Sequence, residues 1–121
     1  MATDKYIIKD GKVVPATLLE WGRFLQDNER RVIFTTIGRR VRVSTIFMGL
    51  DHRWNNRGAP LIYETMIFAE GLKHLDTVRS LYSTRAQAIR GHKIAIEEVR
   101  EFLPKAKVTT VEFETGVLLE T

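Results

Sequence analysis

The residues with the clearest chemical potential form a short polar segment, residues 51–58, with the sequence DHRWNNRG. A connecting loop is usually built from Gly, Pro, Ser or Asn, and it has no need of a Trp between charged and amide side chains. Arg53 and Arg57 are suited to hold phosphates with their forked donors, and Trp54 is suited to stack on a base. The segment therefore predicts recognition of a ligand that is polar, aromatic and anionic.

The amide and carboxylate side chains of the same segment favour a nucleotide. Asn55 and Asn56 offer paired donors and acceptors of the kind that read the edge of adenine, and Asp51 could bond a ribose hydroxyl. Gly58 lets the chain turn closely. The motifs GxxxxGK[ST] and GxGxxG are both absent, which excludes a Walker loop and a dinucleotide fingerprint. The competing interpretation makes Trp54 a plug in the core.

Two catalytic interpretations compete with binding. His52 beside Asp51 could be an acid–base pair, but neighbours on an extended strand point to opposite faces, so Asp51 could instead accept amide hydrogen bonds from the loop. Glu64 lies on an apolar strand face and needs a ligand hydroxyl or a salt bridge, for example to Arg42. An enzyme that cleaves a nucleotide would use His52 and Glu64 as acid and base. We expect no catalytic residue.

Composition excludes several other kinds of site. The chain has no Cys, and its three His are too scattered for a metal centre or an HNH nuclease. Neither a membrane span nor a signal peptide is evident, so we expect a cytosolic protein without cofactor or metal. Residues 1–60 hold 11 Lys or Arg against 6 Asp or Glu, whereas residues 61–121 hold 8 against 9. This balance favours an anionic partner, but not long nucleic acid, because no nucleic-acid-binding motif occurs.

The elements that position the polar segment are predicted mainly as strands. Their alternation and turn signals place them at residues 5–9, 12–14, 31–37, 40–48, 61–68, 77–82 and 107–113. In the fourth strand, Val41, Val43, Thr45 and Phe47 share one face. Phe24, Phe47, Phe68 and Tyr82 are expected mostly in the core. The polar segment then connects the fourth strand to the fifth.

Two helices are predicted, and each begins at a capping box, a Thr followed three residues later by Glu or Gln. The first covers residues 18–28, and Gly22 inside it suggests close packing there. The second runs over residues 84–103, and its apolar stripe includes His92, which we expect in a core or an interface. The expectation is an α+β fold, an antiparallel sheet with a short N-terminal and a long C-terminal helix packed on it, in one domain of residues 1–121.

Several segments occur together in a recognisable order. STIFMGLDH, PLIYETMIF and YST precede the GHK of the second helix, and EWGRF lies in the first helix, so the pattern covers residues 17 to about 100. It resembles a group of small phage and prophage proteins that includes the first family of Thoeris anti-defence proteins. The resemblance implies an α+β homodimer, in some cases a hexamer, without catalytic activity.

The resemblance also implies a sponge for a host signal. A host sensor makes a cyclic ADP-ribose isomer from NAD, and the phage protein binds this isomer and withholds it from the effector. Some members also sequester cyclic oligonucleotides. A protein of this kind acts in the host bacterial cytoplasm. The main rival outside enzymes is an inhibitor that docks the polar segment on a host defence protein.

These lines of reasoning give one set of expected ligand-binding residues. Trp54 or Phe47 would stack on adenine, and Arg23, beside Trp21, would come from a second subunit or another pocket. A homo-oligomer is expected because the last stretch ends in apolar residues with little chain left to cover them. The complete set is Trp21, Arg23, Phe47, Asp51, His52, Arg53, Trp54, Asn55, Asn56, Arg57 and Glu64.

Overall fold

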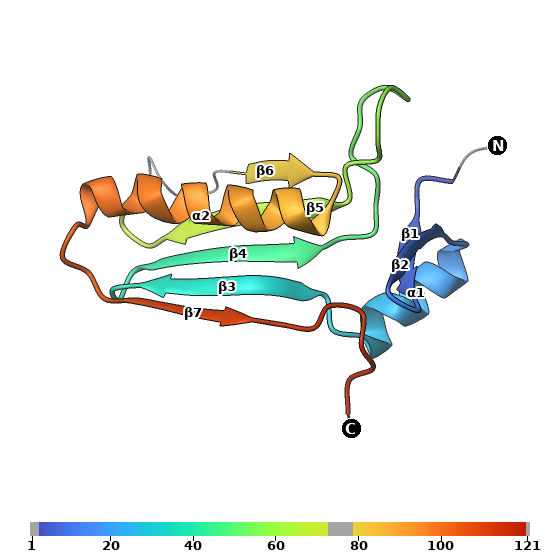
Figure 1. Ribbon diagram of the computed structural model, residues 1–121, viewed down its shortest axis with the longest axis horizontal. Helices are drawn as coiled ribbons and strands as arrows, with labels where there is room; N and C mark the ends of the chain where they lie inside the picture. The colour runs from blue at the N-terminus through green and yellow to red at the C-terminus, as the bar shows by residue number, and fades with distance from the viewer. Residues whose placement is uncertain (1–2, 73–78, 121) are drawn as a thin grey trace.

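The computed structural model describes residues 3–72 and 79–120, which form a small hairpin, a five-stranded sheet and two helices (Figure 1). The elements are β1 (Tyr6–Lys9), β2 (Lys12–Pro15), α1 (Leu18–Asp27), β3 (Arg31–Ile37), β4 (Val41–Phe47), β5 (Tyr63–Ala69), β6 (Arg79–Tyr82), α2 (Arg85–Phe102) and β7 (Val108–Glu112). The large sheet has the order β6-β5-β4-β3-β7, and its neighbouring strands are all antiparallel. The predicted α+β architecture with a short and a long helix is confirmed.

The main core lies between α2 and one face of the large sheet, along which the helix runs (Figure 1). The predicted face of β4 is confirmed, because Val41, Val43, Thr45 and Phe47 are all fully buried. His92 of α2 is also fully buried against this face, as its position in the apolar stripe predicted. The alternation of the strands therefore identified the covered face of the sheet correctly.

Both helix starts are confirmed. The Thr17 and Thr84 side chains each accept a bond from the backbone amide three residues later, and the capping box is complete in each case. The prediction of close packing at Gly22 was wrong, because a Cβ there would meet no atom within 4 Å. The close approach is at Gly91 instead, where a Cβ would lie 1.9 Å from the Tyr82 hydroxyl oxygen. This glycine lets α2 pack against β6.

Neither helix covers the opposite face of the large sheet in the described part of the chain. Phe68 of β5 was expected in the core, but it is 45% exposed because it points to this open face. Val111 of β7 is 48% exposed on the same side. Of the predicted strand at 77–82, residues 79–82 form β6, and residues 77–78 lie outside the described part of the chain.

The C-terminal segment folds back on the chain near the end of α1. Leu119 donates its backbone amide to Asp27 at 2.8 Å, and Gly116 donates to Glu29 at 2.7 Å. Leu118 remains 75% exposed although its backbone forms a bridge with Asn28. No helix in the described residues is long and apolar enough to cross a membrane.

Candidate functional site

The polar segment forms a loop that projects from the body of the protein between β4 and β5 (Figure 1). Backbone hydrogen bonds close its base: Met48 donates to the Ile62 carbonyl at 2.8 Å, and His52 donates to the Leu61 carbonyl at 3.0 Å. The Asp51 amide also donates to the carbonyl of Asp4 at 2.8 Å, which ties the loop to the N-terminal segment. The loop is thus fixed at its base before its tip begins.

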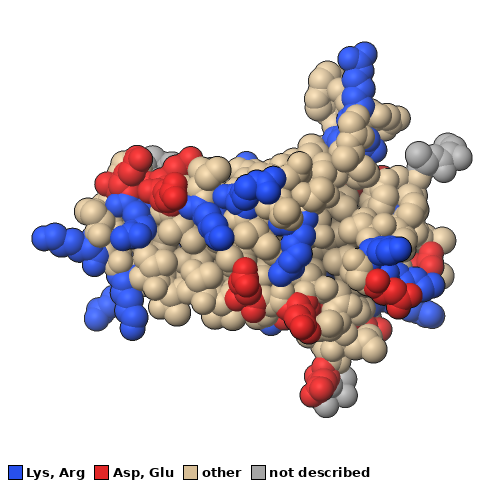
Figure 2. Space-filling model, in the orientation of Figure 1, with Lys and Arg blue, Asp and Glu red and all other residues tan. Residues whose placement is uncertain are grey.

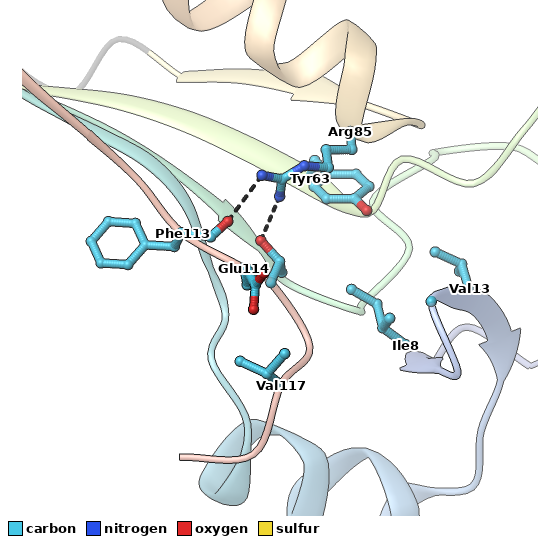
Figure 3. A pocket seen from close by; sticks show the side chains of 9 residues that line it. Ile8, Val13, Tyr63, Arg85, Phe113, Glu114 and Val117 are labelled. Atoms are coloured by element: carbon cyan, nitrogen blue, oxygen red, sulfur yellow. Dashed lines mark hydrogen bonds between the residues drawn. The ribbon is translucent and has the colours of Figure 1, made fainter. Parts of the chain in front are cut away.

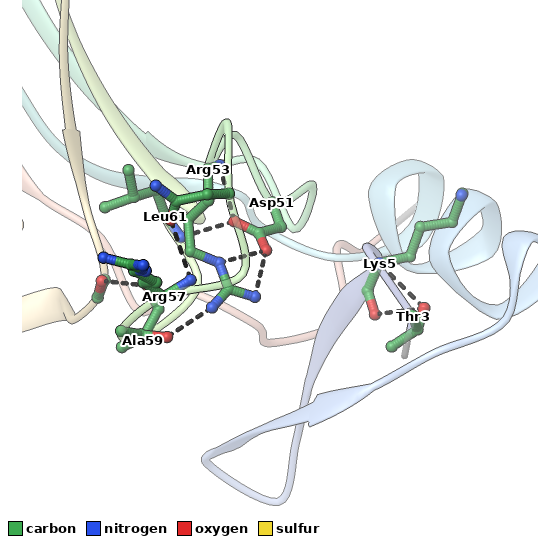
Figure 4. Close-up of polar contacts among 10 residues, drawn as sticks. Thr3, Lys5, Asp51, Arg53, Arg57, Ala59 and Leu61 are labelled. Carbon is green, nitrogen blue, oxygen red and sulfur yellow. Dashed lines mark hydrogen bonds and ion pairs between the residues drawn. The ribbon is translucent and has the colours of Figure 1, made fainter. Parts of the chain in front are cut away.

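Asp51 is the centre of the loop's hydrogen bonding (Figure 4). Its Oδ1 accepts the amides of Arg53 and Leu61, both at 3.0 Å, and its Oδ2 accepts the Arg53 Nε at 2.7 Å. Burial raises the pKa of Asp51, but the hydrogen bonds from Arg53 and Leu61 outweigh it and leave the pKa below its usual value. The interpretation of Asp51 as an acceptor of loop amides is therefore confirmed.

The two arginines of the loop have different surroundings. The side chain of Arg53 is only 15% exposed, and its guanidinium is bound by Asp51 and by the carbonyl of Gly58. The guanidinium of Arg57 is bound by no described residue, although its backbone amide donates to Asn55 Oδ1 at 3.0 Å. Figure 2 shows basic side chains on the projecting loop. Arg57 is therefore the arginine available to a ligand, while Arg53 holds the loop together.

The tip of the loop presents a large aromatic surface. Trp54 is 94% exposed, so the alternative interpretation of this residue as a core plug was wrong. Asn56 is exposed beside it, whereas Asn55 is half-buried and uses its side-chain oxygen within the loop. We call Trp54, Asn56 and Arg57 the loop tip. These three side chains are exposed, and no described residue bonds their polar side-chain groups.

An ionic cluster lies at the junction of the loop and the sheet. Arg79 of β6 forms an ion pair with Glu64 and donates to His52 Nδ1 at 3.1 Å. The predicted salt bridge from Glu64 to a strand arginine is confirmed, but β6 and not β4 supplies the arginine, so the example of Arg42 was wrong. Arg79 thus bonds both His52 and Glu64, the two groups of the proposed acid–base pair. Sequence reasoning missed Arg79, and its only signal was its place in a short strand of polar and apolar residues.

The other predicted binding residues are not part of the loop. Phe47 is fully buried and makes edge contacts with the rings of Phe24 and Tyr63, at centroid distances of 5.6 and 5.2 Å, so no ring face is free for stacking. Trp21 donates its Nε1 to the carbonyl of Met48 at 3.1 Å and thereby joins α1 to the end of β4. Arg23 is exposed on α1, and no hydrogen bond or ion pair joins it to the loop in the described structure.

A cavity lies elsewhere, between the N-terminal hairpin, the start of α2 and the C-terminal segment (Figure 3). Its volume is about 470 Å³, and its polar side chains include Tyr63 from the large sheet, Arg85 from the helix, and Glu114 and Thr115 from the C-terminal segment. Neither Tyr63 nor Arg85 was singled out in the sequence, because Tyr63 looks like a core aromatic and Arg85 like a helix surface residue. Among the described residues, no three His, Asp or Glu side chains gather in a way that could hold a metal ion.

No family model matches this chain, and no curated protein or solved structure matches it.

Proposed function

We propose that the protein is a binding protein that sequesters a cyclic ADP-ribose-type signal, and possible further ligands are cyclic oligonucleotides. It acts without catalysis in the cytoplasm of a bacterial host and so blocks immune signalling. The observation that carries the proposal is the loop tip, where the ring of Trp54 is 94% exposed and the guanidinium of Arg57, three residues further along, is bound by no described residue. A base, a phosphate and a ribose match the stacking, ionic and hydrogen-bonding groups present there.

The bracing of the loop supports this proposal. Because Asp51 and Arg53 fix the loop base, Trp54 and Arg57 lose less freedom when a ligand binds than they would on a flexible loop. Stacking of a base on an aromatic side chain contributes about 1–3 kcal/mol. A hydrogen bond from a charged group adds about 1.5–3 kcal/mol. Two subunits that each offer a tip would enclose a small ligand more fully than one.

We propose a homo-oligomer, a dimer or a hexamer, for this reason and for a second one. Phe68 and Val111 are exposed on the open face of the large sheet, and Leu118 is exposed in the C-terminal segment. A second copy of the chain is the occupant that we assign to this surface, since an oligomer would bury these side chains in the absence of any other protein. Sedimentation of the purified protein at micromolar concentration tests this, and a monomer contradicts it.

The projecting shape of the loop favours one other function. An exposed Trp at the tip of a protruding loop could also insert into a pocket of a host defence protein, because buried Trp side chains often contribute most to protein–protein binding. The two functions differ in what the purified protein binds. An inhibitor of a protein binds no small nucleotide at all, whereas a sponge binds one with the partner protein absent.

Calorimetric titration with cyclic ADP-ribose isomers tests the proposal. Trp54→Ala is expected to weaken binding by about 1–3 kcal/mol with little dependence on salt. Arg57→Ala is expected to weaken it by about 1.5–3 kcal/mol, and this loss shrinks as salt rises because the wild-type attraction is screened. The controls are Arg90→Ala, which removes an exposed arginine from α2, and Leu18→Ala, which removes an exposed large apolar side chain from α1. Full affinity in a folded double variant of Trp54 and Arg57 would show that the loop tip is not the site.

The same experiment separates a sponge from an enzyme. After incubation, heat-released ligand is analysed by mass spectrometry. The sponge returns the ligand unchanged, whereas cleavage that is lost in His52→Ala or Glu64→Gln would establish the nucleotide-cleaving alternative.

A further inference from the structure

We infer that the protein has a second binding site, in the cavity of Figure 3, for a small organic anion with an apolar body. The cavity has a volume of about 470 Å³, within the size range of small-molecule sites in proteins. None of the three loop-tip residues lines it. The inference is therefore independent of the nucleotide-binding proposal.

The anionic part of the ligand is indicated by Arg85, the first residue of α2. Its NH1 donates to Thr115 Oγ1 at 2.6 Å and its NH2 donates to the Phe113 carbonyl at 2.9 Å, so both acceptors are neutral. No ion pair joins Arg85 to any carboxylate in the described part of the chain, including Glu114, which also lines the cavity. The guanidinium is thus held in place with an uncompensated charge and with donors to spare.

A second polar group comes from Tyr63. The residue is only 4% exposed, and its hydroxyl makes no hydrogen bond with a described residue. Every fully buried side-chain oxygen or nitrogen atom of the described residues has a hydrogen-bond partner. Because the Tyr63 hydroxyl has none, it is not fully buried, and a ligand in the cavity that Tyr63 lines can reach it. Burial raises the pKa of Tyr63, an effect that the charge of Arg85 opposes, so the hydroxyl remains a donor at neutral pH. Tyr63 therefore supplies a second donor to the same cavity.

Apolar side chains form another part of the cavity wall, which also includes Glu114 and Thr115. Ile8 and Val13 approach from the hairpin, and Val117 approaches from the C-terminal segment (Figure 3). Val13 is 42% and Val117 is 46% exposed, so an apolar ligand body that covers them removes hydrocarbon surface from water. A carboxylate or phosphate group bound by Arg85, with a hydrocarbon or aromatic body against these side chains, matches both parts of the cavity.

Titration of the full chain with four probes tests the inference. The probes are 4-phenylbutyrate, phenyl phosphate, the neutral 4-phenylbutyramide and inorganic phosphate. We expect at least one of the two amphipathic anions to bind more than about tenfold tighter than the amide, which lacks the charge, and than inorganic phosphate, which lacks the apolar body. The comparison of the two anions identifies the head group. Equal binding of the amide, or no binding of either anion at millimolar concentration, would overturn the inference.

Two variants locate the binding in this cavity. Tyr63→Phe removes one hydroxyl and is expected to weaken the anion about fivefold. Val13→Glu places a negative charge in the wall and is expected to weaken it more than about tenfold. Tyr6→Phe, the same change outside the lining residues, and Trp54→Ala at the loop tip are expected to bind like the wild type. Thermal melts confirm that the variants fold, and wild-type affinity in both Tyr63→Phe and Val13→Glu would show that the anion binds elsewhere.

Discussion

The buried histidine of α2 makes the stability of this protein depend on pH in a defined direction. Both ring nitrogens of His92 are hydrogen bonded, Nε2 to Thr35 Oγ1 at 2.8 Å and Nδ1 to Thr45 Oγ1 at 2.7 Å. These two hydroxyls continue to Thr110 and Thr65 on the neighbouring strands. One helix and four strands thus share a single polar network inside an otherwise apolar core, and this network is closed to solvent at the histidine.

The size of this pH-dependent change in the free energy of unfolding follows from the pKa of His92. Burial lowers the pKa of His92 from 6.5 to about 4. Between these values the unfolded chain binds a proton that the folded chain does not, so the free energy of unfolding falls as pH falls. Above pH 6.5 the contribution is fully present, and below about pH 4 this group causes no further loss. Over the whole window the loss amounts to about 3 kcal/mol, at about 1.4 kcal/mol per pH unit.

Urea denaturation of the wild type and of His92→Gln measures this effect. Between pH 6.5 and pH 5 we expect the wild type to lose about 2 kcal/mol more than the variant, because Gln does not titrate. Subtracting the pH dependence of the variant from that of the wild type removes the contributions of carboxylates such as Asp51, which are the same in both proteins. Equal pH dependence in the two proteins would refute the reasoning. So would an NMR titration that gives His92 a pKa near 6.5 in the folded protein.

Four further changes test the loop, the packing and one helix cap. Asp51→Ala removes the acceptor of two loop amides and should lower the free energy of unfolding by about 1–3 kcal/mol; unchanged hydrogen exchange of these amides would contradict this. Gly91→Ala forces a Cβ against Tyr82 and should destabilise by about 1–3 kcal/mol. In Gly22→Ala the new Cβ meets no atom, so this change should stabilise the protein by about 1 kcal/mol. A higher melting temperature for Gly91→Ala than for Gly22→Ala would be evidence against the packing described. Thr84→Ala should cost about 1 kcal/mol through the lost helix cap, measured by urea denaturation against the wild type.

The loop shows how far sequence reasoning reaches within one short segment. The residue types of 51–58 marked it correctly as an unusual loop, because a connecting loop has no need of a Trp between charged and amide side chains. The sequence did not show that Arg53 is bound within the loop whereas Arg57 is exposed, since this difference depends on how the loop folds around Asp51. Two similar side chains four residues apart acquired different surroundings only through that local fold.

Sequence alone determined the features that depend on near neighbours along the chain. The starts of both helices and the buried side of β4 were predictable, because a capping box covers four consecutive residues and strand alternation has a period of two. Tertiary structure alone decided which partner lies across each strand. Glu64 pairs with Arg79 because β6 adjoins β5, and Phe68 is exposed because α2 covers the other face of the same strand. Strand order and helix placement minimise the free energy of the whole chain, and no short window of sequence contains them.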